Sequence, residues 1–326
     1  MPRLKQTAAE TDGKSYLELI QEADNFPFDP LEVSKYYKLF LPGDEEPHGY
    51  LLPEIVAKMP WTGDFMVDQN SKRITVHDRS HGQKTAQAVN AAFQNIVKKC
   101  IDGDTFRILC RQHSEPFLIP SAVYDQPVYV ERFAAPLFGI TCRGAHLIAY
   151  TYSKDHDLHL WIPRRSQHLF AYPGMLDTTV AGGVKAGVTP FQTIIQESHE
   201  EASLEAKYIE RKIYAGGLVS HMSVTGKGFK GEQGLVVPDF IYVYDLELPS
   251  DTIPKPHDEE VKEFYRMPVR EVQAALKAAE FKPDSAMVII DFFIRHGIIT
   301  ADNEGQYVEI CTRLRRRLPF RTGLPR

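Results

Sequence analysis

The segment that decides the fold is residues 182–204, which read GGVKAGVTPFQTIIQESHEEASL. Two glycines open it, and a run with helical periodicity follows Thr189. Thr189 is a favourable N-cap, Pro190 suits the first helical position, and Gln192 completes a capping box. Beyond the cap, apolar and small residues recur at the i, i+3 and i+4 spacing of one buried helix face. The segment therefore predicts a glycine turn that leads into an amphipathic helix.

Three glutamates, Glu197, Glu200 and Glu201, share another face of this predicted helix, because they are three and four residues apart. Like charges so close together destabilise a helix unless a cation lies among them. Mg²⁺ and Mn²⁺ prefer carboxylate oxygens and retain waters that a phosphate can displace. The cluster is therefore a candidate metal site, and a solvated acidic face is the alternative.

The same segment resembles the Nudix box, whose pattern is Gly, five residues, Glu, seven residues, and then Arg-Glu-apolar-x-Glu-Glu-x-Gly-apolar. The residues that match it in register are Gly182, Glu197, Glu200, Glu201 and Leu204. The residues that depart from it are Val188 for the first Glu, Gln196 for the Arg, Ser198 for an apolar residue and Ser203 for the second Gly. The resemblance implies Mg²⁺ or Mn²⁺ held by the three glutamates and the Gly182 backbone. Without the Arg, we expect the glutamates to be less firmly oriented than in the family pattern.

The resemblance also suggests which residues do the chemistry. Glu200 and Glu201 are assigned as catalytic, and so is Glu260, which matches a glutamate often found in the corresponding loop of the superfamily. Glu259 and Glu263 compete with Glu260 for the role of general base.

Four residues are candidates for binding the substrate. Arg164 and Arg165 have the fork geometry that suits phosphate, although a surface pair beside a strand is an equally good interpretation. Gly183 lets the backbone approach the phosphates. Tyr172, near the glycine turn, offers a ring that can stack on a heterocycle, and Trp161 and Phe170 could stack in the same way.

Composition excludes several classes of protein. The chain has 326 residues, and its 38 basic and 43 acidic residues give a net charge of −5, with no overall attraction to nucleic acid or anionic membrane. A group of arginines near the C-terminus lacks the interleaved aromatics of a nucleic-acid site, so a solvated helix end is the preferred interpretation. No apolar run spans a bilayer, no secretory leader is evident, and the four cysteines are scattered. We therefore expect a cytoplasmic protein.

The fold class expected is α+β: a Nudix α/β/α sandwich preceded by a small α+β domain. The predicted boundaries are a flexible terminus at 1–14, an N-terminal domain at 15–133, the Nudix domain at 134–318 and a basic tail at 319–326. The predicted helices are 15–23, a short one running toward Phe40, 85–99, 190–202, 268–280, 283–296 and 304–318. The predicted strands are 65–67, 73–76, 106–110, 128–130, 138–142, 146–152, 159–162, 212–217, 239–246 and the segment after 260. A glycine- and lysine-containing loop is expected at 220–234.

The similarity extends beyond the box to the thiamine pyrophosphokinase-related Nudix proteins of fungi and plants. It covers about residues 25–318, and the stretches that carry it are Gly49–Leu51, Trp161–Ser166, Tyr172–Asp177, Ala181–Gly183 and Asp291–Gly297. The resemblance implies metal-dependent cleavage of damaged thiamine diphosphates, such as the oxo and oxythiamine forms, to monophosphates as a form of metabolite repair. Kinase activity is not implied.

Two alternatives remain open at this stage. One is a catalytically weak Nudix-fold module that binds a ligand, suggested by Val188 and Gln196. The other is a hydrolase of a different nucleoside or sugar diphosphate. In each case the expected partner is a small-molecule diphosphate, without nucleic acid or membrane, and the oligomeric state is open.

Overall fold

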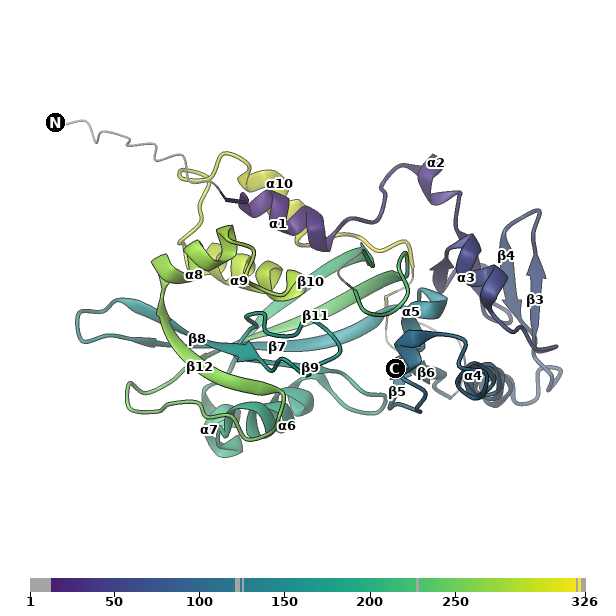
Figure 1. Cartoon of the computed structure of the whole chain (residues 1–326), viewed down its shortest axis with the longest axis horizontal. Helices are drawn as coiled ribbons and strands as arrows, with labels where there is room; N and C mark the ends of the chain where they lie inside the picture. Colours follow the sequence, from purple (N-terminus) through teal and green to yellow (C-terminus); the bar gives the residue numbers. More distant parts are fainter. Residues whose placement is uncertain (1–12, 121–123, 125, 227–228, 321, 324–326) are drawn as a thin grey trace.

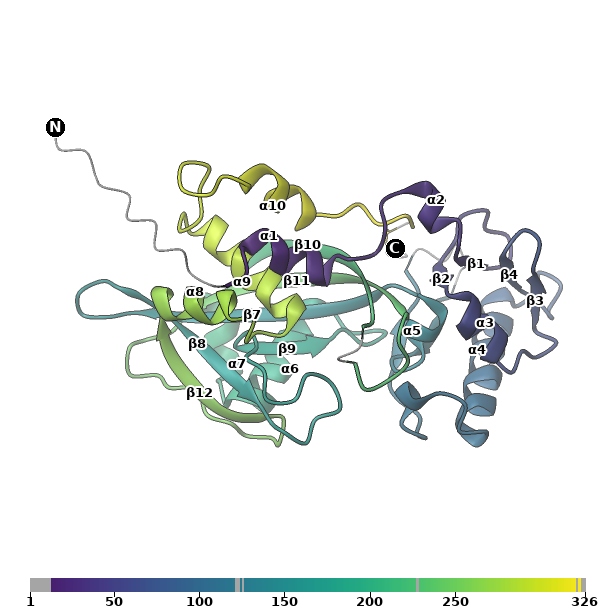
Figure 2. The same ribbon diagram turned by 45° about the horizontal axis from the view of Figure 1, so that its top comes forward.

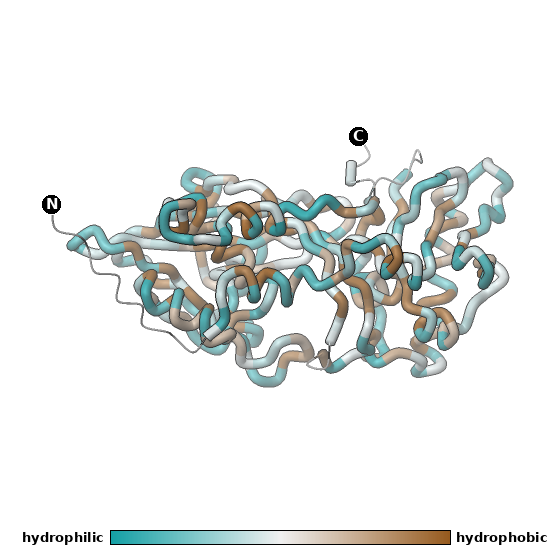
Figure 3. Tube along the Cα trace, turned by 90° about the horizontal axis from the view of Figure 1, so that it is seen from above, coloured by the Kyte–Doolittle hydropathy of each residue, from teal (hydrophilic) through white to brown (hydrophobic). Residues whose placement is uncertain are grey.

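The structure, a computed structural model, describes residues 13–323 apart from 121–123, 125, 227–228 and 321. Of the predicted flexible terminus at 1–14, residues 1–12 lie outside the described residues. Figure 3 shows hydrophobic segments running through the interior of the molecule and hydrophilic segments at its outer loops. Within the described residues, none of the helices combines the length and apolar character that a membrane crossing requires.

A six-stranded sheet forms the centre of the C-terminal part, in the order β10-β11-β7-β8-β12 with β9 paired to β7. Its strands are β7 Cys142–Tyr152, β8 Leu158–Arg165, β9 Val180–Gly183, β10 Tyr214–Val224, β11 Val236–Glu247 and β12 Val261–Pro268. One face carries α8 Val269–Lys277, α9 Pro283–Arg295 and α10 Tyr307–Arg313, and the other carries α6 Pro190–Ala202 and α7 Ala206–Lys212 (Figure 1). The predicted α+β class and its α/β/α layering are confirmed.

The sheet divides where β7 changes partner. Near its end β7 pairs with β8 through residues 150–152, and nearer its start it pairs with β9 through residues 144–147. The later part of β8, residues 161–165, pairs with β12, and Arg164 also forms an isolated bridge with Leu176 in the segment before β9. β8 and β9 therefore separate, and the residues that follow β8 and precede β9 meet α6 at this division.

The N-terminal part is built on a four-stranded sheet in the order β2-β1-β4-β3, with α3 and α4 beside it (Figure 2). Its elements are α2 Pro30–Val33, β1 Tyr37–Phe40, β2 Gly49–Leu51, α3 Pro53–Lys58, β3 Phe65–Asp68, β4 Arg73–Val76, α4 Thr85–Asp102, β5 Pro116–Leu118, β6 Tyr129–Glu131 and α5 Ala135–Phe138. The predicted strands at 65–67 and 73–76 and the helix from Thr85 are confirmed. The short strands β5 and β6 form a separate hairpin.

Several local predictions were wrong, each where a short apolar run has no clear period. The predicted strand 106–110 is a 3₁₀ turn at Arg107–Leu109, and the predicted strand 138–142 is the end of α5 followed by Gly139 with φ of 62°. The helix expected to run toward Phe40 ends at Val33, because residues 37–40 pair with β2 and β4 instead. The loop expected from Ser220 begins only after Val224, since β10 pairs with β11 that far.

The first helix, α1 Tyr16–Ala23, lies on the C-terminal part of the molecule rather than on the four-stranded sheet. Its buried residues Leu17, Ile20 and Ala23 share a core with α9 and α10. An amphipathic pattern shows that a helix has a face to bury but not which partner covers it. The predicted N-terminal domain at 15–133 therefore begins with a helix that packs on the C-terminal part of the molecule.

The arginines near the C-terminus hold α1 and the following turn in place. The Arg316 guanidinium is buried and donates to Asp24 Oδ1 at 2.8 Å and to the Phe26 carbonyl at 2.7 Å. Phe320 packs on Tyr50, with ring centroids 5.4 Å apart. The expectation of a solvated basic helix end was wrong for Arg316, and the last helix ends at Arg313 rather than Leu318.

Replacing Arg316 by alanine is expected to lower the free energy of unfolding by about 3 kcal/mol, because the buried Asp24 carboxylate loses its closest cation. Urea unfolding followed by circular dichroism measures this change. The adjacent Arg317 is exposed, so Arg317→Ala is the matched control and should change stability by less than about 0.5 kcal/mol. Equal losses in both variants would contradict a specific role for the Asp24 pair.

Candidate active site

The helix α6 begins as its sequence predicts. The Thr189 hydroxyl accepts from the Gln192 N–H at 3.2 Å, and the Gln192 side chain accepts from the Thr189 N–H at 3.0 Å. Pro190 is the first helical residue. The buried face includes Ile194 and Ala202, which pack against the sheet. The predicted capping box and helix are confirmed, and they fix the position of the three glutamates.

The two glycines at the end of β9 leave room for neighbours on opposite sides. A Cβ atom on Gly182 would lie 2.4 Å from Glu197 Cγ, and one on Gly183 would lie 2.6 Å from the Phe117 ring. Consecutive strand residues face opposite ways, so one glycine accommodates the catalytic helix and the next accommodates the N-terminal domain. Any side chain at Gly182 would displace Glu197.

The carboxylates of α6 are crowded and partly desolvated. Glu201 is buried and accepts from the Ala181 N–H at 3.0 Å, and burial raises its pKa well above the usual range. Burial also raises the pKa of Glu197 to about 7, and the carboxylates of Glu200 and Glu260 act in the same direction. Glu200 accepts from the Gln196 side-chain amide at 2.9 Å. Gln196 stands where the Nudix pattern has an arginine, and it contacts Glu200 through a neutral amide instead of a charged guanidinium.

A divalent cation fits this donor set, because hard carboxylate oxygens whose charge is disfavoured by burial and by one another gain from a shared positive ion. Among the described residues, no three carboxylate, imidazole or thiol groups already enclose a space for a metal ion. The metal ligands Gly182, Glu197, Glu200 and Glu201 therefore stay a prediction.

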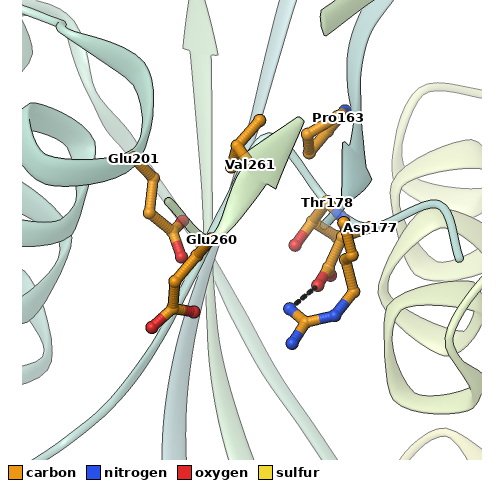
Figure 4. Close-up of a pocket in the computed structure, with 7 residues that line it drawn as sticks. Pro163, Asp177, Thr178, Glu201, Glu260 and Val261 are labelled. Atoms are coloured by element: carbon orange, nitrogen blue, oxygen red, sulfur yellow. Dashed lines mark hydrogen bonds and ion pairs between the residues drawn. The ribbon is translucent and has the colours of Figure 1, made fainter. Parts of the chain in front are cut away.

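A pocket lies beside α6 at the division of the sheet. The residues that line it are Pro163, Arg165, Asp177, Thr178, Glu201, Glu260 and Val261. Figure 4 shows Glu201 and Glu260 side by side, opposite Asp177 and Thr178. The Arg165 guanidinium donates to Asp177 Oδ2 at 2.9 Å and thereby stays at the pocket. Three acidic groups, one of them paired with a fixed guanidinium, thus share one pocket.

The structure separates the two arginines that the sequence grouped together. They are neighbours in β8 and point to opposite faces of the sheet. Arg165 lines the pocket, whereas Arg164 donates to the Gly174 carbonyl at 2.9 Å and pairs with Glu280 at 3.3 Å, beyond α8. Arg164 is not among the pocket residues, so Arg165 is the better candidate for a phosphate contact.

Of the three glutamates considered for a general base, Glu260 is the one that lines the pocket. It is exposed, and its backbone carbonyl accepts from the Ser166 N–H at 2.9 Å, which fixes its loop beside β8. Glu263 pairs instead with Lys262 at 3.3 Å. Position alone therefore favours Glu260, and its role as base stays a prediction.

The aromatic residues near the glycine turn have different surroundings. Tyr172 and Phe170 are each 37% exposed, and Phe170 meets Phe229 edge to face with centroids 6.0 Å apart. Trp161, in contrast, is buried in the core under α6 and α7. The expectation that Trp161 stacks on a substrate was wrong, because its strand position places it inside the sandwich.

Sequence reasoning missed Asp177 and Thr178 as site residues. Asp177 is buried, pairs with Arg165 and accepts from the Ser285 hydroxyl of α9. Thr178 shares a hydrogen bond of 3.0 Å with His146 Nδ1. The sequence does show that Asp177 lies three residues before β9, the strand that ends in Gly182 and Gly183. Only the tertiary fold, however, brings Asp177 to Arg165.

The chain is similar to several known proteins. The family model described as the NUDIX domain matches residues 143–288. The chain is 33% identical to the uncharacterized protein YJR142W of Saccharomyces cerevisiae over 95% of this chain and 93% of that protein. It is 39% identical to the chloroplastic Nudix hydrolase 20 of Arabidopsis thaliana over 60% of this chain, which spans about half (50%) of that plant protein. A solved Ap4A hydrolase of C. elegans aligns with 48% of this chain and 99% of its own, at 14% identity and a TM-score of 0.35.

Glu201→Gln and Glu200→Gln are each expected to reduce hydrolysis by roughly a hundredfold or more, since each removes a charged oxygen from the proposed metal site. Stability should hold or rise, because crowding of like charges is relieved. Phosphate release with Mg²⁺ and urea unfolding measure the two effects. Glu210→Gln, on an exposed position of α7, is the control. Wild-type rates in both α6 variants would refute the site assignment.

Gln196→Arg is expected to tighten metal binding or raise kcat by about tenfold, as an outer-shell partner of Glu200 gains a charge. Metal titration monitored by calorimetry, together with steady-state kinetics, tests this change. Gln196→Ala serves as the companion variant and should weaken both quantities. If the arginine variant instead weakens both, then Gln196 is already the better partner in this protein.

Proposed function

Because residues 143–288 match the NUDIX domain and part of the chain is similar to plant Nudix hydrolases, we propose that the protein hydrolyses oxidised or analogue forms of thiamine diphosphate in a reaction that depends on Mg²⁺ or Mn²⁺. The family acts on small-molecule diphosphates and generally uses divalent metals. The proposed products are the thiamine monophosphate analogue and phosphate. Removal of a damaged cofactor in this way is metabolite repair.

One observation supports diphosphate chemistry most directly: Glu201 and Glu260 share a pocket with Arg165. A diphosphate needs its negative charge offset and a water activated next to phosphorus. A bound divalent cation supplies both effects by neutralising phosphate charge and making a water more acidic. Glu197, Glu200 and Glu201 are the residues that would hold it.

The chain's own side chains have distinct tasks in this proposal. Arg165, oriented by Asp177, donates to a phosphate oxygen through its planar fork. Glu260 is exposed at the pocket edge and can accept a proton from the attacking water. The Gly182–Gly183 backbone approaches the phosphates without a side chain in between.

The choice of a thiamine-like substrate rests on the full-length resemblance and on the charges around Tyr172. Lys282 pairs with Asp284 at 2.9 Å, and Arg165 pairs with Asp177 at 2.9 Å. Because these carboxylates are already paired with cations, they provide little electrostatic stabilisation for a cationic thiazolium ring. A neutral oxidised ring escapes the penalty of burying an unpaired charge. The enzyme would therefore spare intact thiamine diphosphate.

Oxothiamine diphosphate is expected to have a kcat/KM about a hundredfold higher than that of thiamine diphosphate, since an unpaired buried charge costs several kcal/mol. A panel of both compounds, oxythiamine diphosphate, ADP-ribose and coenzyme A is assayed with Mg²⁺ and again with EDTA, which should abolish turnover. Glu201→Gln under the same conditions shows whether a contaminant contributes. Comparable kcat/KM across the panel would reject the thiamine assignment while leaving diphosphate hydrolysis in place.

A further inference from the structure

The loop that carries Glu260 is attached to the C-terminal end of α6. This loop connects β11 to β12. The last four carbonyls of an α-helix have no partner within the helix, so they need one from elsewhere. The Asp258 N–H donates to the Glu200 carbonyl at 3.0 Å, and the Lys255 N–H donates to the Ala202 carbonyl at 3.0 Å. The loop therefore caps the helix whose side chains are the proposed metal ligands.

Two side chains join the same helix end to the loop. The Ser203 hydroxyl, directly after α6, donates to the Lys255 carbonyl at 3.0 Å. His257 Nδ1 lies 3.1 Å from the His199 carbonyl oxygen. Since a carbonyl only accepts, the imidazole N–H is the donor there. The rings of His257 and His199 also meet edge to face, with centroids 5.0 Å apart. One bond thus runs from the helix end to the loop, and the other runs from the loop to the helix.

The serine at this helix end departs from the Nudix pattern, which has its second glycine at position 203. The Ser203 backbone is left-handed, with φ of 54° and ψ of 32°. A side chain disfavours this conformation, whereas glycine adopts it freely. Glycine, however, has no hydroxyl to donate to Lys255. The serine therefore adds a contact with the loop at a position where glycine would fold more easily.

The loop is stiff between these contacts and Glu260. Pro254 and Pro256 each fix their own φ, and each keeps the residue before it out of the helical conformation. Asp258 Oδ1 accepts from the Glu260 N–H at 3.0 Å. On its other side, the Glu260 carbonyl accepts from the Ser166 N–H at 2.9 Å. The backbone of Glu260 is thus held by the capping segment and by the end of β8.

The position of this backbone matters because of where the side chain lies. Glu260 lines the same pocket as Glu201, and Figure 4 shows the two carboxylates side by side. Glu260 is exposed, so its backbone position largely decides where its carboxylate can reach. A displacement of about 1 Å in a reacting group can cost about a hundredfold in rate.

We propose that Ser203 and His257 are positioning residues, which hold Glu260 in register with the carboxylates of α6. They act through the loop between β11 and β12 and do not themselves line the pocket. This inference rests on the proposed role of Glu260 as general base but not on the identity of the leaving group. It gives a task to Ser203, one of the four departures from the Nudix pattern.

The first test is kcat and KM of Ser203→Gly for the fastest substrate of the panel. We expect kcat to fall by roughly tenfold to a hundredfold, with KM within about twofold of wild type. The midpoint of urea unfolding should hold or rise, because glycine relieves the left-handed backbone. Ser203→Ala loses the hydroxyl but keeps the strain, and it should lower kcat by a similar factor. A purely structural role would instead make the glycine variant as active as wild type.

The matched control is His156→Gly. His156 is an exposed residue in the turn between β7 and β8, with φ of 63°, and it does not line the pocket. The change relieves the same kind of backbone strain without touching the loop of Glu260. It should leave kcat unchanged.

The second test replaces the imidazole. His257→Ala should lower kcat as Ser203→Gly does, because the loop loses a bond to the His199 carbonyl. His257→Asn should recover most of the loss, since the asparagine amide can still donate to that carbonyl. Mg²⁺ affinity, measured by calorimetry, should be unchanged in all of these variants. Weaker Mg²⁺ binding would mean that the glutamates of α6 are disturbed instead, and it would overturn the proposal.

A double-mutant comparison shows whether the effect passes through Glu260. Once Glu260→Gln has removed the base, adding Ser203→Gly should change kcat by less than about twofold. Losses that simply add would place the effect elsewhere and overturn the proposal. A loss in Glu260→Gln without any loss in the Ser203 and His257 variants would refute the positioning role alone. A wild-type rate in Glu260→Gln would refute the proposed base, and the positioning role with it.

Discussion

The structure depends on the absence of side chains at two consecutive positions, Gly182 and Gly183. Because neighbouring strand residues face opposite ways, Gly182 admits Glu197 of the catalytic helix and Gly183 admits Phe117 of the N-terminal domain. Each neighbour lies closer to the backbone than a Cβ would allow. The steric constraint therefore positions α6 and the N-terminal hairpin at the same point of the chain.

The carboxylates of Glu197 and Glu201, which lie at this point, lower the stability of the folded protein. Burial raises the pKa values of Glu197 and Glu201, so keeping both ionised in the folded protein is unfavourable. Neighbouring charges are compensated instead, as in the pair of Arg165 with Asp177. In the proposed active site stability is traded for affinity, since a bound cation and a phosphate would together restore the missing compensation.

Sequence reasoning succeeded where a signal is local. The Thr189 capping box and the spacing of the glutamates fix α6 within a few residues, and the strand and helix periods predict many of the other elements. The sandwich itself was implied by the resemblance to the Nudix box. It could not choose between Arg164 and Arg165. Their adjacent positions in β8 place the two side chains on opposite faces of the sheet, but only the tertiary structure shows which face holds the pocket. Asp177 escaped notice because no local pattern records a contact made by tertiary packing, here with Arg165 and with Ser285 of α9.

The N-terminal segment holds the C-terminal sandwich at two distant places. α1 covers α9 and α10 and is tied by the Asp24–Arg316 pair, while the β5–β6 hairpin reaches the loop before α6 on the other side. A domain held at one point can turn about its linker, whereas two attachments on opposite layers remove that freedom. Its orientation toward the catalytic loop is therefore set by folding, before any substrate binds.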